Sequence, residues 1–113
     1  MGRMNNLALE LAAEGWDYGA SMFSMEAEKT YDEALRLLQK KHDDYGPKNI
    51  AESPGGPLNG LRVRIWDKIA RINHLIDSGA DPKNESLRDS FLDLANYSMI
   101  ALMVIDEKWP GTK

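Results

Sequence analysis

The chain has 113 residues, 42% hydrophobic and 28% charged, and a formal net charge of −4 at pH 7, a composition that suits one domain over residues 1–113 and excludes a disordered chain. The absence of cysteine excludes a disulfide framework and thiolate metal sites, and the acidic balance argues against binding to a nucleic-acid backbone. Residues 1–11 hold no signal-peptide core and no stretch reaches the roughly 18 apolar residues of a membrane span, so we expect a cytoplasmic protein without membrane contact.

The N-terminal half of the chain predicts two helices. A short helix is expected over residues 6–14, within an N-terminal extension of residues 1–20. Because a helix of this length is not stable alone, we expect it to pack against another part of the protein. A longer second helix starts near Ser21, or at the capping-box pattern that opens on Thr30. It stops before Gly46, because glycine and the proline that follows it end helices.

A third helix is the clearest element of the sequence. It follows a long loop rich in glycine and proline over about residues 46–60, and Gly79 is its natural C-cap. Its apolar residues are spaced by four, four, three and four positions, which is the spacing of one helical face. These residues are Leu61, Ile65, Ile69, Ile72 and Ile76.

The fourth predicted helix begins near Asn84 or Ser86 and ends near Glu107. Its main apolar stripe consists of Leu87, Phe91, Leu94, Ser98, Ala101 and Ile105. Further apolar residues widen this stripe, and a helix that is apolar around so much of its circumference is central or faces a partner on two sides. We therefore expect a homodimer or a higher homo-oligomer. No segment alternates like a strand, so the predicted fold is all-α: an antiparallel bundle of three main helices plus the short N-terminal helix.

Arg64, Lys68 and Arg71 form a basic row on one face of the third helix. This row is able to bind a phosphate-rich ligand, because arginine forks match phosphate oxygens. The alternative is a solvated flank that pairs with acids on a neighbouring helix.

Glu85, Asp89 and Asp93 form an acidic row at the start of the fourth helix. Three acids on one face repel one another unless a positive group lies there. Mg²⁺, which prefers oxygen ligands, is one such group, and the basic row is another. Asp89 also completes a capping box with Ser86.

The end of the second helix offers a further candidate site. Lys41, Asp44 and Tyr45 precede Gly46, and this segment is either a plain helix stop or a loop that presents the three side chains to a small ligand.

Three blocks of the sequence resemble the "nucleotide modification associated domain 1" family. The chain carries a lysine before D-Y-G at residues 40–46, K-x-x-R at residues 68–71, and E-S-x-x-D-x-x-x-D-x-x-N-Y at residues 85–97. The resemblance covers about residues 31–102 and implies a phage or bacterial cytosolic protein, in the host cytoplasm if phage-encoded, near nucleotide metabolism. It further implies that the charged positions of the three blocks, together with Tyr45 and Tyr97, converge at one site.

Three functions follow from these observations. The first is binding of a nucleotide or other small phosphorylated molecule, with Lys41, Asp44, Tyr45, Arg64, Lys68, Arg71 and Tyr97 as ligand-binding residues. The second is Mg²⁺-dependent hydrolysis, because the chain has a looser similarity to MazG-type all-α nucleotide pyrophosphohydrolases; Glu85, Asp89 and Asp93 would then hold the metal. The third is a non-enzymatic interaction protein in which the two charged rows neutralise each other.

Overall fold

The computed structural model describes residues 18–112 and contains four helices in that range. They are α2 (Tyr18–Tyr45), α3 (Lys48–Ala51), α4 (Pro57–Ser78) and α5 (Leu87–Ile105), and the described residues contain no strand, which confirms the all-α prediction. The predicted helix at residues 6–14 lies outside the described residues. No helix in the described range is long and apolar enough to cross a bilayer.

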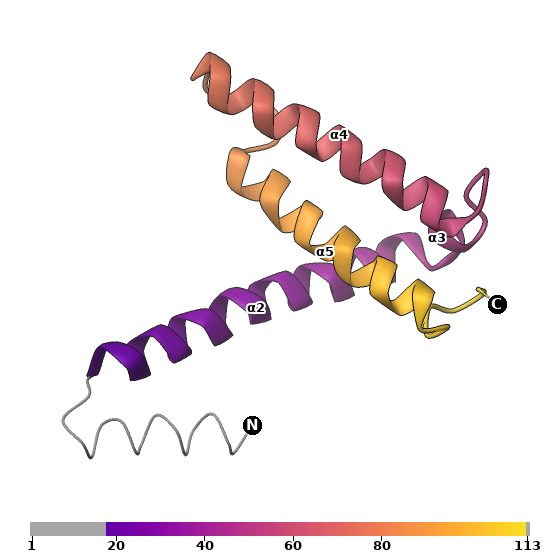
Figure 1. The fold of residues 1–113 in the computed structure, drawn as a ribbon, viewed down its shortest axis with the longest axis horizontal. Coiled ribbons are helices and arrows are strands. Elements are labelled where there is room, and N and C mark those ends of the chain that lie inside the picture. Colours follow the sequence, from indigo (N-terminus) through magenta and orange to yellow (C-terminus); the bar gives the residue numbers. More distant parts are fainter. Residues whose placement is uncertain (1–17, 113) are drawn as a thin grey trace. The chain divides into compact units, whose positions relative to one another are not determined.

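The chain divides into two compact units, residues 1–33 and residues 34–113. Of the first unit the structure describes the N-terminal part of α2. The second unit holds the end of α2 together with α3, α4 and α5, and every feature of the candidate site described below lies within it (Figure 1).

Helix α2 begins at Tyr18, close to the earlier of the two predicted starts, near Ser21, and the pattern at Thr30 does not cap it. The Thr30 hydroxyl donates a hydrogen bond to the Glu26 carbonyl oxygen at 2.8 Å, four residues back, as threonine does inside a continuous helix. The end of α2 is as predicted: Gly46 has a φ of +68°, and its N–H donates to the His42 carbonyl oxygen at 2.8 Å. Glycine adopts this left-handed conformation without the penalty of a Cβ.

The predicted loop over residues 46–60 is wrong in part, because it contains α3 and the first turn of α4. Pro57 occupies the N-terminal position of α4, where its missing N–H costs nothing. Gly60 lies inside α4 and faces the Ser53 side chain. A Cβ at this position would lie 2.4 Å from the Ser53 Oγ, which explains why the helix has a glycine here. The buried Ile50 anchors α3 in the core.

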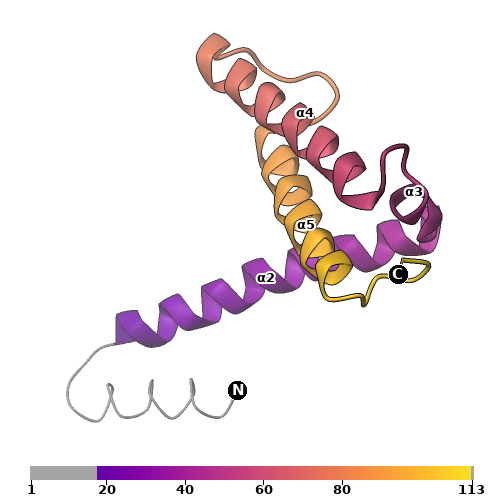
Figure 2. The same ribbon diagram turned by 45° about the vertical axis from the view of Figure 1, so that its right-hand side comes forward.

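Helices α4 and α5 run side by side in opposite directions, as Figures 1 and 2 both show. Gly79 ends α4 in the predicted left-handed conformation, with a φ of +63°. Ser86 caps α5 through the predicted capping box with Asp89, in which each side chain bonds the other residue's backbone N–H. Both boundaries are therefore set by local chemistry.

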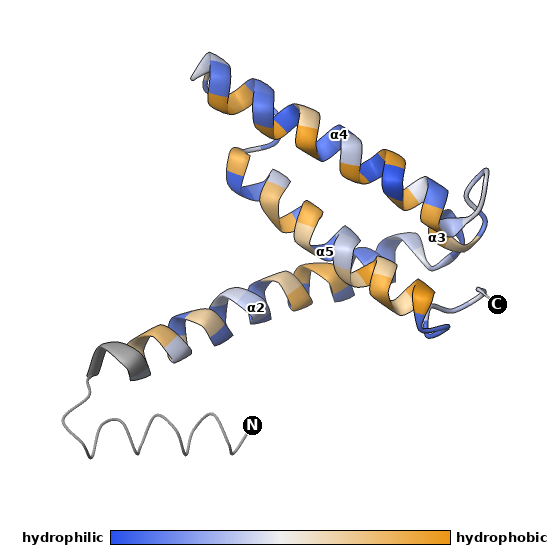
Figure 3. Cartoon of the chain, in the orientation of Figure 1, coloured by the Kyte–Doolittle hydropathy of each residue, from blue (hydrophilic) through white to orange (hydrophobic). Residues whose placement is uncertain are grey.

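The apolar core occupies one end of the α4–α5 pair, where α3 and the segment after α5 meet it. Its buried members are Ile50, Leu61, Ile100, Val104 and Trp109. The main apolar stripe of α5 is not its buried face: Phe91 and Ile105 are exposed, and the buried face of this helix starts with polar residues. In chain order the buried residues of α5 are Ser90, Asp93, Asn96, Ile100 and Val104. Figure 3 shows the apolar colouring spread over the C-terminal half of α5.

Candidate functional site

An ion-pair network joins α2, α4 and the start of α5. Asp93 lies at its centre, with one carboxylate oxygen 2.7 Å from the Lys41 ammonium and the other 3.0 Å from the Lys68 ammonium. Lys68 also contacts Glu85, at 2.8 Å. The Asp93 side chain is only 9% exposed, so both of its cationic partners are needed to compensate the loss of hydration.

The Glu85 carboxylate also has several hydrogen-bond and ion-pair partners. It accepts hydrogen bonds from Lys68 at 2.8 and 3.0 Å and from the fully buried Ser90 hydroxyl at 2.6 Å. The Arg71 Nε lies 3.2 Å from the same carboxylate, and a terminal nitrogen of Arg71 donates to the Glu85 carbonyl oxygen. The basic row and the acidic row therefore pair with each other through Lys68 and Arg71, which is one of the two arrangements predicted for them.

The network changes the pKa of three of its members. Burial alone raises the pKa of Asp93, but hydrogen bonds from Lys41 and Lys68 and the charges of these lysines outweigh burial and hold it below its ordinary value. The pKa of Glu85 is lowered in the same way, against burial, by Lys68 and Ser90. Burial lowers the pKa of Lys68, and its bonds to the two carboxylates more than reverse this and raise it.

These shifts predict acid-sensitive stability. In the unfolded chain Asp93 and Glu85 take up protons near their ordinary values of about 4, whereas the folded protein takes them up only at lower pH. The unfolded state therefore binds more protons in this window, and the free energy of unfolding falls as the pH falls below about 4.5. Urea unfolding between pH 6 and pH 3 measures this slope. Asp93→Asn should make it shallower, and identical slopes in the two proteins would contradict the assignment.

The acidic row does not form a single set of metal ligands. Asp89 is exposed and caps α5, whereas Glu85 and Asp93 turn toward the cations. Among the described residues no group of three or more histidine, aspartate or glutamate side chains is placed to hold a metal ion. The predicted Mg²⁺ site therefore gains no support from the geometry.

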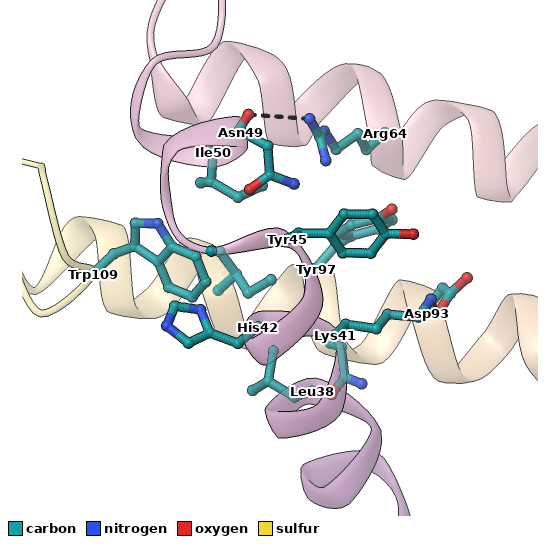
Figure 4. A pocket seen from close by; sticks show the side chains of 13 residues that line it. Leu38, Lys41, His42, Tyr45, Asn49, Ile50, Arg64, Asp93, Tyr97 and Trp109 are labelled. Carbon is teal, nitrogen blue, oxygen red and sulfur yellow. Dashed lines mark hydrogen bonds and ion pairs between the residues drawn. The ribbon is translucent and has the colours of Figure 1, made fainter.

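A pocket of about 300 Å³ lies beside the ion-pair network, where the end of α2 meets α3, α4 and α5 (Figure 4). It is lined by Leu38, Lys41, His42, Tyr45, Gly46, Asn49, Ile50, Arg64, Asp93, Asn96, Tyr97, Ile100 and Trp109. Aromatic rings and aliphatic side chains make up most of this wall, and Lys41 and Arg64 supply its positive charge. Its size is at the lower end of the range for small-molecule sites.

The aromatic wall of the pocket is fixed by packing and by a hydrogen bond. The Trp109 ring is 5% exposed, and its Nε1–H donates to the Pro47 carbonyl oxygen at 3.0 Å. The His42 ring meets it edge to face, with centroids 5.1 Å apart. Figure 4 shows Tyr45 in front of Tyr97, between Arg64 on one side and Lys41 on the other. Tyr45 is 68% exposed and therefore lies at the pocket mouth.

Arg64 and Lys41, the two cations of the pocket, can each donate further hydrogen bonds to a ligand. Arg64 donates one hydrogen bond, at 3.1 Å, to the Asn49 carbonyl oxygen, and a guanidinium has five N–H donors. The Lys41 side chain is 43% exposed although it contacts Asp93. An anionic group at this rim would therefore meet two positive side chains on different helices.

The structure separates the predicted ligand-binding residues into two groups. Lys41, Tyr45, Arg64 and Tyr97 line the pocket, whereas Lys68 and Arg71 belong to the ion pairs and Asp44 is exposed outside the lining. The pocket therefore takes one member of each charged row, Arg64 and Asp93, and the remaining residues of both rows lie outside its lining. Sequence reasoning missed several lining residues, among them Asn49, Asn96 and Trp109. The apolar Ile50 in a polar loop and the isolated Trp109 before Pro110 are the signals that could have indicated a folded wall there.

A family model described as nucleotide modification associated domain 1 matches residues 15–105. The match extends beyond residues 31–102, where the motifs suggested it, and it takes in all four described helices. Trp109 lies outside it. Searches of curated proteins and of solved structures found no match. Because the matched region covers most of its length, the chain belongs to the nucleotide modification associated domain 1 family.

Proposed function

We propose that the protein binds a small phosphorylated molecule with a planar ring, a nucleoside monophosphate being the class that fits best. The observation that carries the proposal is the composition of the pocket: Lys41 and Arg64 flank the Tyr45 ring at its mouth, and Tyr97 lies behind (Figure 4). Arginine and lysine bind phosphate oxygens, and aromatic rings stack on bases. The family description, which refers to nucleotides, agrees with this chemistry.

The charge and size of the site favour one phosphate over three. Asp93 already compensates much of the Lys41 charge, which leaves Arg64 as the main anchor for an anion. A volume of about 300 Å³, at the lower end of the range for small-molecule sites, suits a ligand of about the size of a single nucleotide. The four purine and pyrimidine ribonucleoside monophosphates are therefore the probes of choice.

The test is a thermal-shift titration with these monophosphates, with the corresponding nucleosides and with inorganic phosphate. A ligand that binds only the folded protein raises its melting temperature. We expect a monophosphate to stabilise the protein more than either of its parts does, because it uses the rings and the cations together. Equal, negligible shifts for all probes would refute the proposal.

Arg64→Ala should weaken binding of the stabilising monophosphate about tenfold to a hundredfold, because a hydrogen bond to a charged group contributes about 1.5–3 kcal/mol. Arg62→Ala is the matched control. Arg62 is exposed on the same helix, does not line the pocket, and donates a hydrogen bond to the Asn59 side-chain oxygen at 2.5 Å. The two variants lose the same charge, so isothermal titration should show weaker binding for Arg64→Ala alone. Equal affinities in the two variants would remove Arg64 from the site.

A further inference from the structure

The outer face of α5 carries a second feature, which is separate from the pocket. The pocket uses Asp93, Asn96, Tyr97 and Ile100 on the inner face of this helix. On the opposite side lies a row with spacings of four, three, four and three residues: Phe91, Ala95, Ser98, Leu102 and Ile105. All five are exposed, including the three large ones at 50%, 54% and 61%. We call this row the outer face of α5.

The spacing of the outer face is that of a coiled-coil seam, in which apolar residues recur every 3.5 positions and face a partner helix. The helix carries no charged residue between Leu94 and Ile105. Single exposed apolar residues are ordinary on a protein surface. A continuous row of them along one helix is typical of an interaction site. Met99, which is 43% exposed, widens the stripe.

We propose that the outer face of α5 pairs antiparallel with the same face of a second copy of the chain, about a two-fold axis at Ser98. The argument is the symmetry of the row about its middle residue. Phe91 and Ile105 are equally far from Ser98, and Ala95 and Leu102 nearly so. An antiparallel pair therefore sets Phe91 against Ile105 of the partner subunit and the small Ala95 against Leu102 of the partner subunit. Such facing of large and small residues fills an interface, and a two-fold contact requires a self-complementary patch.

Charges at the two ends of α5 agree with this direction. Arg88 and Asp106 are exposed and lie five helical turns apart on the same edge of the outer face. In an antiparallel pair each edge faces the same edge of the partner, so Arg88 comes near Asp106 of the partner subunit. Arg88 also has a partner within its own chain. The contact with Asp106 of the partner subunit would therefore set the direction of the pair, and Arg88 does not depend on it for a partner. In a parallel pair each edge would face the opposite edge of the partner, and Arg88 would not meet Asp106 of the partner subunit.

Sedimentation equilibrium of the full chain tests the association. We expect a dimer for the unchanged protein, at least tenfold weaker association for Ile105→Glu, and an unchanged dimer for Ile76→Glu. Ile76 is the matched control, because it is an isoleucine exposed to a similar degree, 56% against 61%, on α4. Circular dichroism melts verify that both variants remain folded. A monomeric unchanged protein, or equal dissociation of the two variants, would overturn the proposal.

The absence of cysteine allows a direct test of the geometry. A single Ser98→Cys substitution places two thiols at the two-fold axis, so mild oxidation should give a disulfide-linked dimer. Single Phe91→Cys and Ile105→Cys variants should not cross-link with themselves, whereas a mixture of the two should, because these positions face each other. Self-linking at residues 91 and 105 without linking at 98 would overturn the antiparallel arrangement.

Discussion

Asp93→Ala is expected to lower the free energy of unfolding by about 3 kcal/mol. The change leaves Lys41 and Lys68 facing each other beside α5, and breaking a buried ion pair by removing one partner costs roughly 3–5 kcal/mol. The expected value is at the lower end of this range because the Lys41 side chain is 43% exposed and because Lys68 keeps Glu85. A loss of about 3 kcal/mol is a large part of the roughly 5–15 kcal/mol by which small domains are stable. Urea unfolding is therefore best measured at low temperature, where the variant is still folded without urea.

Asp89→Ala is the control for this prediction. Asp89 lies one helical turn before Asp93 and is exposed, and its side chain accepts a hydrogen bond from the Ser86 N–H at 3.3 Å. Losing its part of the capping box should cost about 1 kcal/mol or less. If Asp93→Ala destabilised the protein no more than Asp89→Ala does, the network would not be a significant source of stability.

Trp109→Ala is expected to destabilise the protein by about 3–5 kcal/mol, as large-to-small substitutions of buried aromatic residues do. The indole is 5% exposed and packs in the core with Ile50, Leu61, Ile100 and Val104. Its removal also opens one wall of the pocket, so binding of a nucleoside monophosphate should weaken together with stability.

Trp109→Phe separates packing from hydrogen bonding in this position. It retains most of the ring volume but removes the indole N–H that donates to the Pro47 carbonyl oxygen at 3.0 Å, an oxygen that still accepts from the Ala51 N–H. We expect a loss of about 1–2 kcal/mol, smaller than that of Trp109→Ala. Denaturant unfolding of the two variants provides the comparison, and equal losses would contradict the assigned packing role.

The helix boundaries that sequence predicted well are those set by residues next to each other in the chain. Gly46 and Gly79 end helices through their left-handed backbone, and Ser86 begins one through its hydroxyl. The Thr30 pattern has the same local form and yet does not cap, because the helix continues upstream of it. Local patterns thus show where a helix is able to begin, and the neighbouring sequence decides whether it does.

The buried face of α5 could not be predicted from hydrophobicity. Apolar residues occur around most of this helix, so their pattern alone does not select the inner side. The inner side is selected by Ser90, Asp93 and Asn96, each of which finds a partner on another segment or another turn. Asn96, for example, donates to the Ala34 carbonyl oxygen at 3.0 Å, 62 residues away in the chain. Such partners become visible only once the helices are placed.

The candidate site was predictable in its parts and not in its arrangement. Spacing placed Arg64, Lys68 and Arg71 on one helical face, and they do share it. The structure then assigns Lys68 and Arg71 to Glu85 and leaves Arg64 at the pocket, because Arg64 lies nearer to α3 than to the acidic start of α5. A row of like charges in a sequence therefore does not indicate a row of like roles.

The polar contacts between α4 and α5 have a consequence for the alignment of this helical hairpin. Lys68 is held by the carboxylates of Glu85 and Asp93, and Arg71 is held by Glu85. A slip of one turn moves a helix by about 5.4 Å, which would separate all of these groups at once. The hairpin is thereby restricted to a single alignment, and this alignment keeps Arg64 opposite the end of α2.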